Sequence, residues 1–205
     1  GVNNPRGISR PGRWFQSSTR ATPTPATTRS RTMSRWTLST TIQPRADTET
    51  LVDWALELLA DWPAPRVIDL GTGSGAIALA VKHACPQADV HASDLSDAAL
   101  AVARANGQSL GLAVQWHSGA WWQAAPAGRF DLALANPPYV AAGDPHLAAL
   151  RHEPVMALTP AGDRGDGLAD IERIVGGAAA RLHGGGWLLV EHGAEQGQAV
   201  RTAFG

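Results

Sequence analysis

Hydrophobic positions along this chain follow two spacings. Short, almost unbroken apolar runs are typical of strands buried on both faces, and longer stretches with apolar residues three and four positions apart are typical of amphipathic helices. From residue 44 onward the two patterns follow one another in regular order. The runs predict strands at 67–70, 90–93, 113–116, 130–135 and 187–191. The longer stretches predict helices at 47–61, 76–84, 96–110 and 168–182.

This alternation predicts a fold of the α/β class. A strand that is followed by a helix and then by another strand of the same sheet returns in parallel, so we expect a doubly wound, mostly parallel Rossmann-like sheet. In such sheets ligands bind beyond the carboxyl ends of the strands. Three segments, at Gly71, Asp94 and Asn136, directly follow predicted strands. The fold therefore predicts that these three segments share one site.

The most specific segment is the tetrapeptide Asn136-Pro137-Pro138-Tyr139, at the end of the fourth predicted strand. The side-chain carbonyl of Asn136 and a backbone carbonyl near Pro137 can each accept one hydrogen from a planar amino group. Proline fixes φ and has no N–H, so no competing donor stands beside these carbonyls. Tyr139 can cover the flat face of the amino group by stacking. The tetrapeptide predicts methylation of an amide or an exocyclic amine; the alternative is an ordinary Pro-Pro loop.

A glycine-rich turn follows the first predicted strand, with the residues Gly71, Thr72, Gly73, Ser74 and Gly75. Glycine allows a tight turn and lets a ligand approach bare backbone. Asp94 directly follows the second predicted strand, at a position where an acid in a doubly wound fold accepts hydrogen bonds from ribose hydroxyls. A nicotinamide oxidoreductase shares both features but has no use for the Asn-Pro-Pro-Tyr segment. S-adenosyl-L-methionine is therefore the cofactor that we predict.

Taken together, these motifs resemble the HemK-type family of peptide chain release factor glutamine methyltransferases. The resemblance runs from about Gln43 to the C-terminus. Besides the two motifs above, it includes Pro44-Arg45-Ala46-Asp47-Thr48-Glu49, Asp69-Leu70, Asp94, Trp121, His152-Glu153-Pro154, Ala157-Leu158, Gly165-Asp166-Gly167-Leu168 and Trp187-Leu188-Leu189-Val190-Glu191-His192-Gly193. It implies a class I S-adenosylmethionine-dependent methyltransferase sheet. It also implies that Trp121 lines the adenine side of the cofactor site, although Trp121 and Trp122 could instead plug the sheet edge.

The resemblance implies a reaction as well: N5-methylation of the glutamine in the Gly-Gly-Gln loop of a class I release factor, in the cytoplasm. An amide nitrogen is a poor nucleophile because its lone pair is delocalised into the carbonyl. Asn136 and the adjacent backbone carbonyl would orient this lone pair and favour the positive charge that develops on nitrogen. No side chain is an obvious general base, so we expect positioning and electrostatics to dominate. The long segment between Tyr139 and Asp166 is expected to form part of the peptide-binding wall.

The chain departs from the family pattern at two points besides its N-terminal part. Ala46 replaces the second proline of the Pro-Arg-Pro segment, and Gly205 lies inside the expected fifth helix. We therefore expect a five-stranded sheet that lacks the last two strands of a class I methyltransferase and leaves one edge exposed. A fragment that binds the cofactor but is catalytically weak is an alternative reading of the same features.

Residues 1–43 are rich in Arg, Ser, Thr and Pro, and we expect them to be largely disordered, in front of a methyltransferase domain at 44–205. They resemble a transit peptide, a basic tail that contacts RNA, or a degraded form of the helical docking domain that family members carry. We favour the last. The single lysine, Lys82, against sixteen arginines indicates a GC-rich bacterial genome and weakens the transit-peptide interpretation.

Charged residues are distributed unevenly along the 205 residues of the chain. Eight arginines and no acid precede Asp47, whereas nine basic and eighteen acidic residues follow from there on. Phosphate contacts dominate nucleic-acid affinity, so an acidic body disfavours the main alternative, an amino-methyltransferase acting on adenine N6 or guanine N2. A protein substrate fits better, and no apolar run is long enough to predict a membrane partner.

Metal chemistry is not predicted. A single cysteine, Cys85, excludes an internal disulfide and a cysteine-cluster metal site. The seven histidines show no metal-ligand spacing. His146, His152 and His192 lie near the expected site, and we interpret each as structural or solvent-facing.

Overall fold

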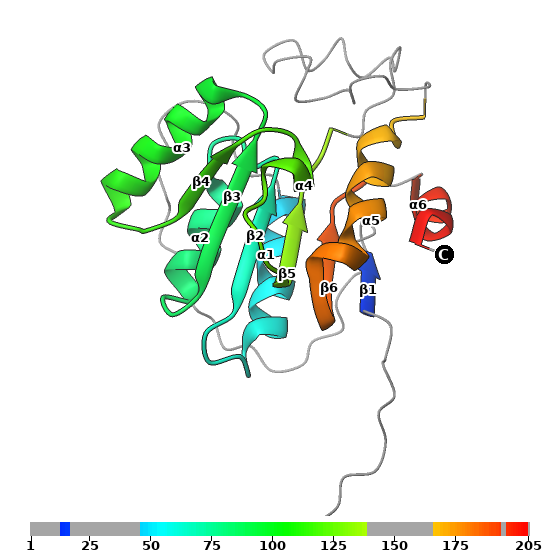
Figure 1. Ribbon diagram of the computed structural model, residues 1–205, viewed down its shortest axis with the longest axis horizontal. Helices are drawn as coiled ribbons and strands as arrows, with labels where there is room; N and C mark the ends of the chain where they lie inside the picture. The colour runs from blue at the N-terminus through cyan, green and yellow to red at the C-terminus, as the bar shows by residue number, and fades with distance from the viewer. Residues whose placement is uncertain (1–12, 17–45, 139–165, 194–195, 205) are drawn as a thin grey trace, which may run out of the picture.

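The computed structural model describes residues 13–16, 46–138, 166–193 and 196–204 (Figure 1). Over these residues six strands form one sheet in the order β1-β6-β5-β2-β3-β4, and all neighbouring strands are parallel. The strands are β1 (Arg13–Gln16), β2 (Arg66–Leu70), β3 (Asp89–Asp94), β4 (Gln115–Ser118), β5 (Phe130–Ala135) and β6 (Leu182–Val190). The predicted α/β class and doubly wound parallel topology are confirmed.

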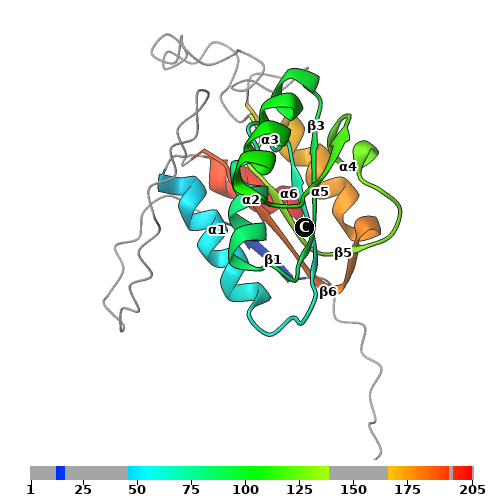
Figure 2. The same ribbon diagram turned by 90° about the vertical axis from the view of Figure 1, so that its left-hand side faces the viewer.

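Helices cover both faces of the sheet. They are α1 (Ala46–Leu59), α2 (Ala76–Ala84), α3 (Asp97–Leu110), α4 (Trp121–Ala124), α5 (Ala169–Arg181) and α6 (Gly197–Phe204). In Figure 2, α1, α2 and α3 lie on one side of the sheet, and α4 and α5 lie on the other. The boundaries of α1, α2, α3 and α5 agree with the sequence prediction to within two residues, whereas α4 was not predicted.

The sheet divides the core into two clusters because side chains alternate between its faces. On one face Leu51 and Ala55 of α1 pack with Val67 of β2. On the other face Ile171 and Ile174 of α5 belong to a cluster with Ile68 of β2. Neighbouring residues of β2 thus belong to opposite clusters, and β2 is held between both layers.

Local capping explains where α3 begins and ends. The hydroxyl of Ser96 accepts a hydrogen bond of 3.2 Å from the backbone N–H of Ala99, so Ser96 is the N-cap of this helix. At the other end Gly111 has φ 64°, the left-handed conformation that closes many helices. Between these residues α3 runs beside β3 and β4, so its first turn lies next to Asp94.

One edge of the sheet differs from the prediction. Strand β1 pairs with β6 in parallel, from Arg13 beside Trp187 to Gln16 beside Val190. The expectation of a five-stranded sheet with β6 at an exposed edge is therefore wrong over the described residues. The expectation of disorder across residues 1–43 is wrong for Arg13–Gln16. Two neighbouring backbone edges satisfy each other's hydrogen bonds, which a reading of local hydrophobic periodicity does not detect.

Two strand boundaries also differ. β4 begins at Gln115, two positions later than predicted. β6 begins at Leu182, five positions earlier than predicted, and it does not pair evenly with β5. Phe130 is paired with Leu182 and Leu132 with Trp187, so β6 advances five positions while β5 advances two. Gly184, Gly185 and Gly186 therefore form a bulge inside the strand, where Gly185 has φ 90°.

Two adjacent glycines of α5 allow a test of how tightly α4 packs on this helix. A Cβ on Gly177 would lie 2.2 Å from Cδ1 of Trp122, whereas a Cβ on Gly176 meets nothing within 4 Å. Gly177→Ala should therefore destabilise the fold by about 1–3 kcal/mol, since overpacking outweighs helix propensity. Gly176→Ala should stabilise it by roughly 0.5–1 kcal/mol.

Urea denaturation of both variants measures these two changes in the free energy of unfolding. Gly176→Ala is the matched control because it makes the same substitution one position earlier in the same helix. Equal effects of the two substitutions would contradict the close packing of Trp122 on α5.

Candidate functional site

Three strand ends meet at one edge of the sheet. Leu70, the last residue of β2, is paired with Ser93 of β3 on one side and with Ala135 of β5 on the other. The residues that follow these positions are Gly71, Asp94 and Asn136. The structure therefore brings together the three segments that the sequence predicted to share a site, at the carboxyl ends of the strands (Figure 1).

The glycine-rich turn folds back against β3. The backbone N–H groups of Gly71 and Thr72 both donate to the carbonyl of Ser93, at 2.8 and 2.9 Å. Gly71 and Gly73 have φ 73° and 56°, values that other residues rarely adopt. A Cβ on Gly73 would meet nothing within 4 Å, so the backbone there is open to a ligand. The side chain of Asn106 on α3 donates to the carbonyl of Ser74 at 3.0 Å and holds the far end of the turn.

The fully buried carboxylate of Asp69 holds the turn and the start of α2 through hydrogen bonds. Oδ2 of Asp69 accepts hydrogen bonds from the hydroxyl of Thr72 at 2.5 Å and from the N–H of Ala78 at 3.2 Å. Burial raises the pKa of Asp69 to about 7, although these two hydrogen bonds act in the opposite direction. Sequence reasoning did not assign Asp69 a role of its own. Its signal was a single acid inside an otherwise apolar strand.

Asp94 already uses its carboxylate to organise the site. Oδ2 accepts from the N–H of Gly73 and Oδ1 from the N–H of Ser96, both at 2.8 Å. A carboxylate has about four lone-pair positions, so acceptor capacity remains for the hydroxyls of a ribose. The residue fits the predicted contact, and it also links the turn to the start of α3.

Leu95 is a candidate that sequence reasoning missed. It is 61% exposed and is the sole exposed large hydrophobic side chain among the described residues. It lies between Asp94 and the N-cap Ser96, outside the apolar stripe of α3. An apolar side chain in this position could cover one face of a flat base. The signal in the sequence was an apolar residue placed between an acid and a helix cap.

The Asn136 segment leaves β5 at the same edge. Asn136 and Pro138 are half-buried and Pro137 is buried. The carbonyl of Ala135, just before Asn136, accepts from the N–H of Glu191 at 2.9 Å. Because Ala135 is paired with Leu70, Asn136 leaves the sheet next to the glycine-rich turn. A role of Asn136 in binding the substrate stays a prediction. Tyr139 and the predicted peptide-binding wall lie outside the described residues.

Both tryptophans of α4, Trp121 and Trp122, donate hydrogen bonds to α5. Nε1 of Trp121 donates to Oδ1 of Asp170 at 3.1 Å, and Nε1 of Trp122 donates to the carbonyl of Ile174 at 2.6 Å. A Cβ on Gly71 would lie 2.7 Å from Cζ3 of Trp121, so this indole covers Gly71. This contact places Trp121 at the glycine-rich turn; that it lines the adenine side of the cofactor site stays a prediction. Both indoles pack with the second core cluster.

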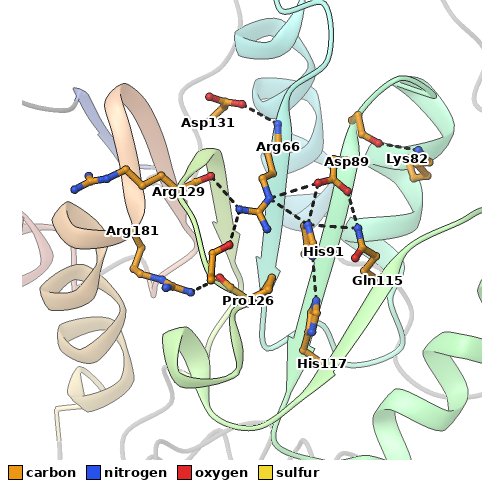
Figure 3. Close-up of polar contacts among 12 residues, drawn as sticks. Arg66, Lys82, Asp89, His91, Gln115, His117, Pro126, Arg129, Asp131 and Arg181 are labelled. Carbon is orange, nitrogen blue, oxygen red and sulfur yellow. Dashed lines mark hydrogen bonds and ion pairs between the residues drawn. The ribbon is translucent and has the colours of Figure 1, made fainter.

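A second polar group lies near the amino ends of the strands (Figure 3). Nδ1 of His91 and Nε2 of His117 are 3.0 Å apart and the two rings are stacked, while Nε2 of His91 lies 3.1 Å from Asp89. Burial lowers the pKa of both histidines.

Of the three histidines that the sequence placed near the site, His192 is buried just after β6. His146 and His152 lie outside the described residues. Over the described part of the chain no three metal-ligating side chains are arranged to hold an ion.

Comparison with known proteins decides the family. The family model named Methyltransferase small domain matches residues 48–163, more than half of the chain. The chain belongs to the methyltransferase small domain family. The matched region begins in α1 and includes the turn, Asp94, Trp121 and the Asn136 segment. Methyltransferases of this fold take their methyl group from S-adenosyl-L-methionine, so the predicted cofactor is confirmed for the family.

The resemblance that the motifs predicted is confirmed. The chain is 55% identical over 162 residues to the release factor glutamine methyltransferase of Bordetella pertussis; the aligned region covers 78% of the chain and 59% of that protein. It is 41% identical over 167 residues to the release factor glutamine methyltransferase of Escherichia coli; the aligned region covers 80% of the chain and 59% of that protein. The chain therefore spans about three fifths of the length of these curated relatives.

Solved structures agree on the fold. The ribosomal protein L11 methylase of Lactobacillus delbrueckii subsp. bulgaricus superposes with a TM-score of 0.56 at 20% identity, over 78% of this chain and 67% of that one. TrmN of Thermus thermophilus superposes with a TM-score of 0.52 at 25% identity, over 77% and 40% of the two chains. Among the helices that the structure describes, none is long and apolar enough to cross a membrane.

Replacing Asp69 with Asn should change how the stability of this protein depends on pH. Because the pKa of Asp69 is raised from 3.8 to about 7, the native state keeps a proton that the unfolded state releases between these values. The stability that this proton contributes is complete below the unfolded pKa and is lost as pH rises through the folded pKa. Asn accepts the same two hydrogen bonds but does not titrate.

Urea denaturation at a series of pH values measures the difference between wild type and Asp69→Asn. The stability of wild type relative to the variant should fall by about 1 kcal/mol per pH unit from about pH 5 to about pH 7 and then level off. Parallel profiles for the two proteins would mean that Asp69 titrates as an ordinary exposed acid.

Proposed function

We propose that this protein transfers a methyl group from S-adenosyl-L-methionine to the side-chain amide nitrogen of a glutamine in a peptide chain release factor. Support for the substrate comes from the relatives at 41% to 55% identity that are named release factor glutamine methyltransferases. The Gly-Gly-Gln loop of a class I release factor is the proposed target, and N5-methylglutamine is the product. Translation termination takes place in the cytoplasm, which is the proposed location.

The observation that carries the proposal is the register of β2 and β5. Leu70 and Ala135 are paired, so the glycine-rich turn and Asn136 leave the sheet side by side. The side-chain carbonyl of an asparagine and a neighbouring backbone carbonyl can accept the two hydrogens of one amide –NH2 group. An amino group held there would present its remaining lone pair toward a ligand bound at the turn. Orientation of this kind is worth a large share of a reaction barrier.

The residues for the cofactor are those that already shape the edge. Gly73 offers open backbone, Asp94 retains acceptor capacity, Leu95 exposes an apolar surface, and Trp121 covers Gly71. When bound, the cofactor supplies an electrophilic methyl group on a sulfonium. Asn136 and the adjacent carbonyl favour the positive charge that develops on the glutamine nitrogen as the new bond forms. The extra proton then leaves to solvent.

Transfer of labelled methyl to purified release factor tests the activity. Asn136→Ala should lower the rate by about a hundredfold or more, because it removes an acceptor that acts on developing charge. Gln108→Ala, an exposed amide on α3, is the matched control and should transfer at the wild-type rate. A release factor with Gln→Ala in its Gly-Gly-Gln loop should accept no label.

Other outcomes of this assay would identify one of the alternative functions or contradict the role of Asn136. Label on DNA or RNA in place of the release factor would identify an amino-methyltransferase that acts on bases. Binding of S-adenosylhomocysteine without transfer to any substrate would identify a cofactor-binding chain that is catalytically weak. Transfer by Asn136→Ala at the wild-type rate would remove Asn136 from the reaction.

Asp94→Ala should weaken binding of S-adenosylhomocysteine by about tenfold or more. It removes the acceptor for ribose hydroxyls and frees the N–H of Gly73, and a hydrogen bond to a charged group is worth roughly 1.5–3 kcal/mol. Isothermal titration calorimetry measures the Kd. Asp97→Asn, an exposed acid three positions later, is the control. A Kd for Asp94→Ala within about twofold of wild type would rule out the ribose contact.

A further inference from the structure

Trp121 has an unusual backbone conformation. Its φ is 44°, and over the described residues it is the only residue besides glycine with a positive φ. A bulky side chain is strained in this region, so the surrounding contacts must hold it there. The side chain makes two contacts that can do so: its six-membered ring lies against Gly71, and its indole N–H reaches α5.

The acceptor on α5 is Asp170, which is 4% exposed. Its Oδ1 accepts from Nε1 of Trp121 at 3.1 Å and from Nη1 of Arg173 at 2.6 Å. Arg173 is half exposed, and its charge balances the buried carboxylate. A charged acceptor makes a stronger hydrogen bond to an indole than a neutral one does. Asp170 therefore fixes the direction in which the Trp121 ring points.

Docking of α4 on α5 does not require this bond. Trp122 anchors the same short helix one turn further along α5, through the carbonyl of Ile174 and against Gly177. The bond from Trp121 to Asp170 acts instead on the one indole that covers the cofactor turn. Its effect should be on the shape of the site more than on the stability of the fold.

We propose that Asp170 is a positioning residue that holds the Trp121 indole over Gly71 and so builds one wall of the cofactor site. Asp170 acts through Trp121 without touching the cofactor. The inference rests on the proposed function, because it assigns the neighbouring turn to S-adenosyl-L-methionine. Loss of the indole bond would let the ring leave Gly71, and the cofactor would then meet a site that is only partly formed.

The first test detects the hydrogen bond from Trp121 to Asp170 directly and needs no ligand. In a two-dimensional 1H–15N spectrum, the indole N–H of Trp121 is identified as the signal lost in Trp121→Phe. Asp170→Ala should move this signal clearly upfield, whereas Arg173→Gln and Asp170→Asn, which both keep an oxygen acceptor, should move it much less. A Trp121 signal that stays in place in Asp170→Ala would overturn the inference.

The second test measures the effect of this bond on the cofactor site, as the Kd for S-adenosylhomocysteine determined by calorimetry. Asp170→Ala should weaken binding by about tenfold, the effect of losing one charge-assisted hydrogen bond, and Asp170→Asn should restore most of the affinity. In a Trp121→Phe background Asp170→Ala should cost less than about twofold further, because Asp170 then has no indole to position. Thermal denaturation should show that the variants remain folded.

The outcomes separate this inference from the proposed function. If wild type binds S-adenosylhomocysteine and Asp170→Ala binds it equally well, only the inference fails. Equal weakening by Asp170→Asn, Asp170→Ala and Arg173→Gln would assign the effect to the ion pair and would also overturn it. If wild type binds no S-adenosylhomocysteine, the proposed function and the cofactor role of Asp170 both fail, while the indole signal still shows whether Asp170 holds Trp121.

Discussion

Strand β2 is hydrogen-bonded on both sides, and the site depends on the register of these two ladders. Leu70 is paired at once with Ser93 and with Ala135, so Gly71, Asp94 and Asn136 all leave the sheet at one level. A shift of one residue in either ladder would turn an apolar face of a strand toward the wrong core cluster. Val67 and Ile68 belong to different clusters, so burial on both faces prevents that shift. The same packing that stabilises the fold thus sets the spacing of the groups proposed to bind cofactor and substrate.

Polar groups buried behind the site hold its shape. Asp69 supports the turn through Thr72 and the start of α2, and Asp94 joins Gly73 to the start of α3. Asp170 connects α5 to the indole that covers Gly71. Each carboxylate accepts two hydrogen bonds, which lowers the cost of removing it from water, although Oδ1 of Asp69 is buried without a partner. The proposed active site is therefore built on rigid helices and strands, with its flexible glycines confined to the turn.

Local sequence was enough to predict most elements of the central sheet. Runs such as Phe130–Ala135 are apolar except for the half-buried Asp131, because these strands are buried on both faces. Ser96 marks the start of α3 by its own hydrogen bond. The errors are at the sheet edge, where pairing between distant segments decides the structure. β1 pairs with β6 across most of the chain, and Gly184–Gly186 belong to a bulge because β5 pairs on both sides of it. Neither feature leaves a periodic signal in its own segment.

The sequence by itself determined the α/β class, the parallel order of the central strands, and the residue types offered at the strand ends, because periodicity, glycine, proline and capping act over a few neighbouring positions. It also identified the family, since several motifs occur in one order. Only the tertiary structure decided which face of Trp121 meets Gly71, that Asp170 receives its indole, that Leu95 is left exposed, and that Asp69 is buried deeply enough to raise its pKa. These properties depend on contacts between segments about 50 positions apart in the sequence, which only the packing of the sheet and helices brings together.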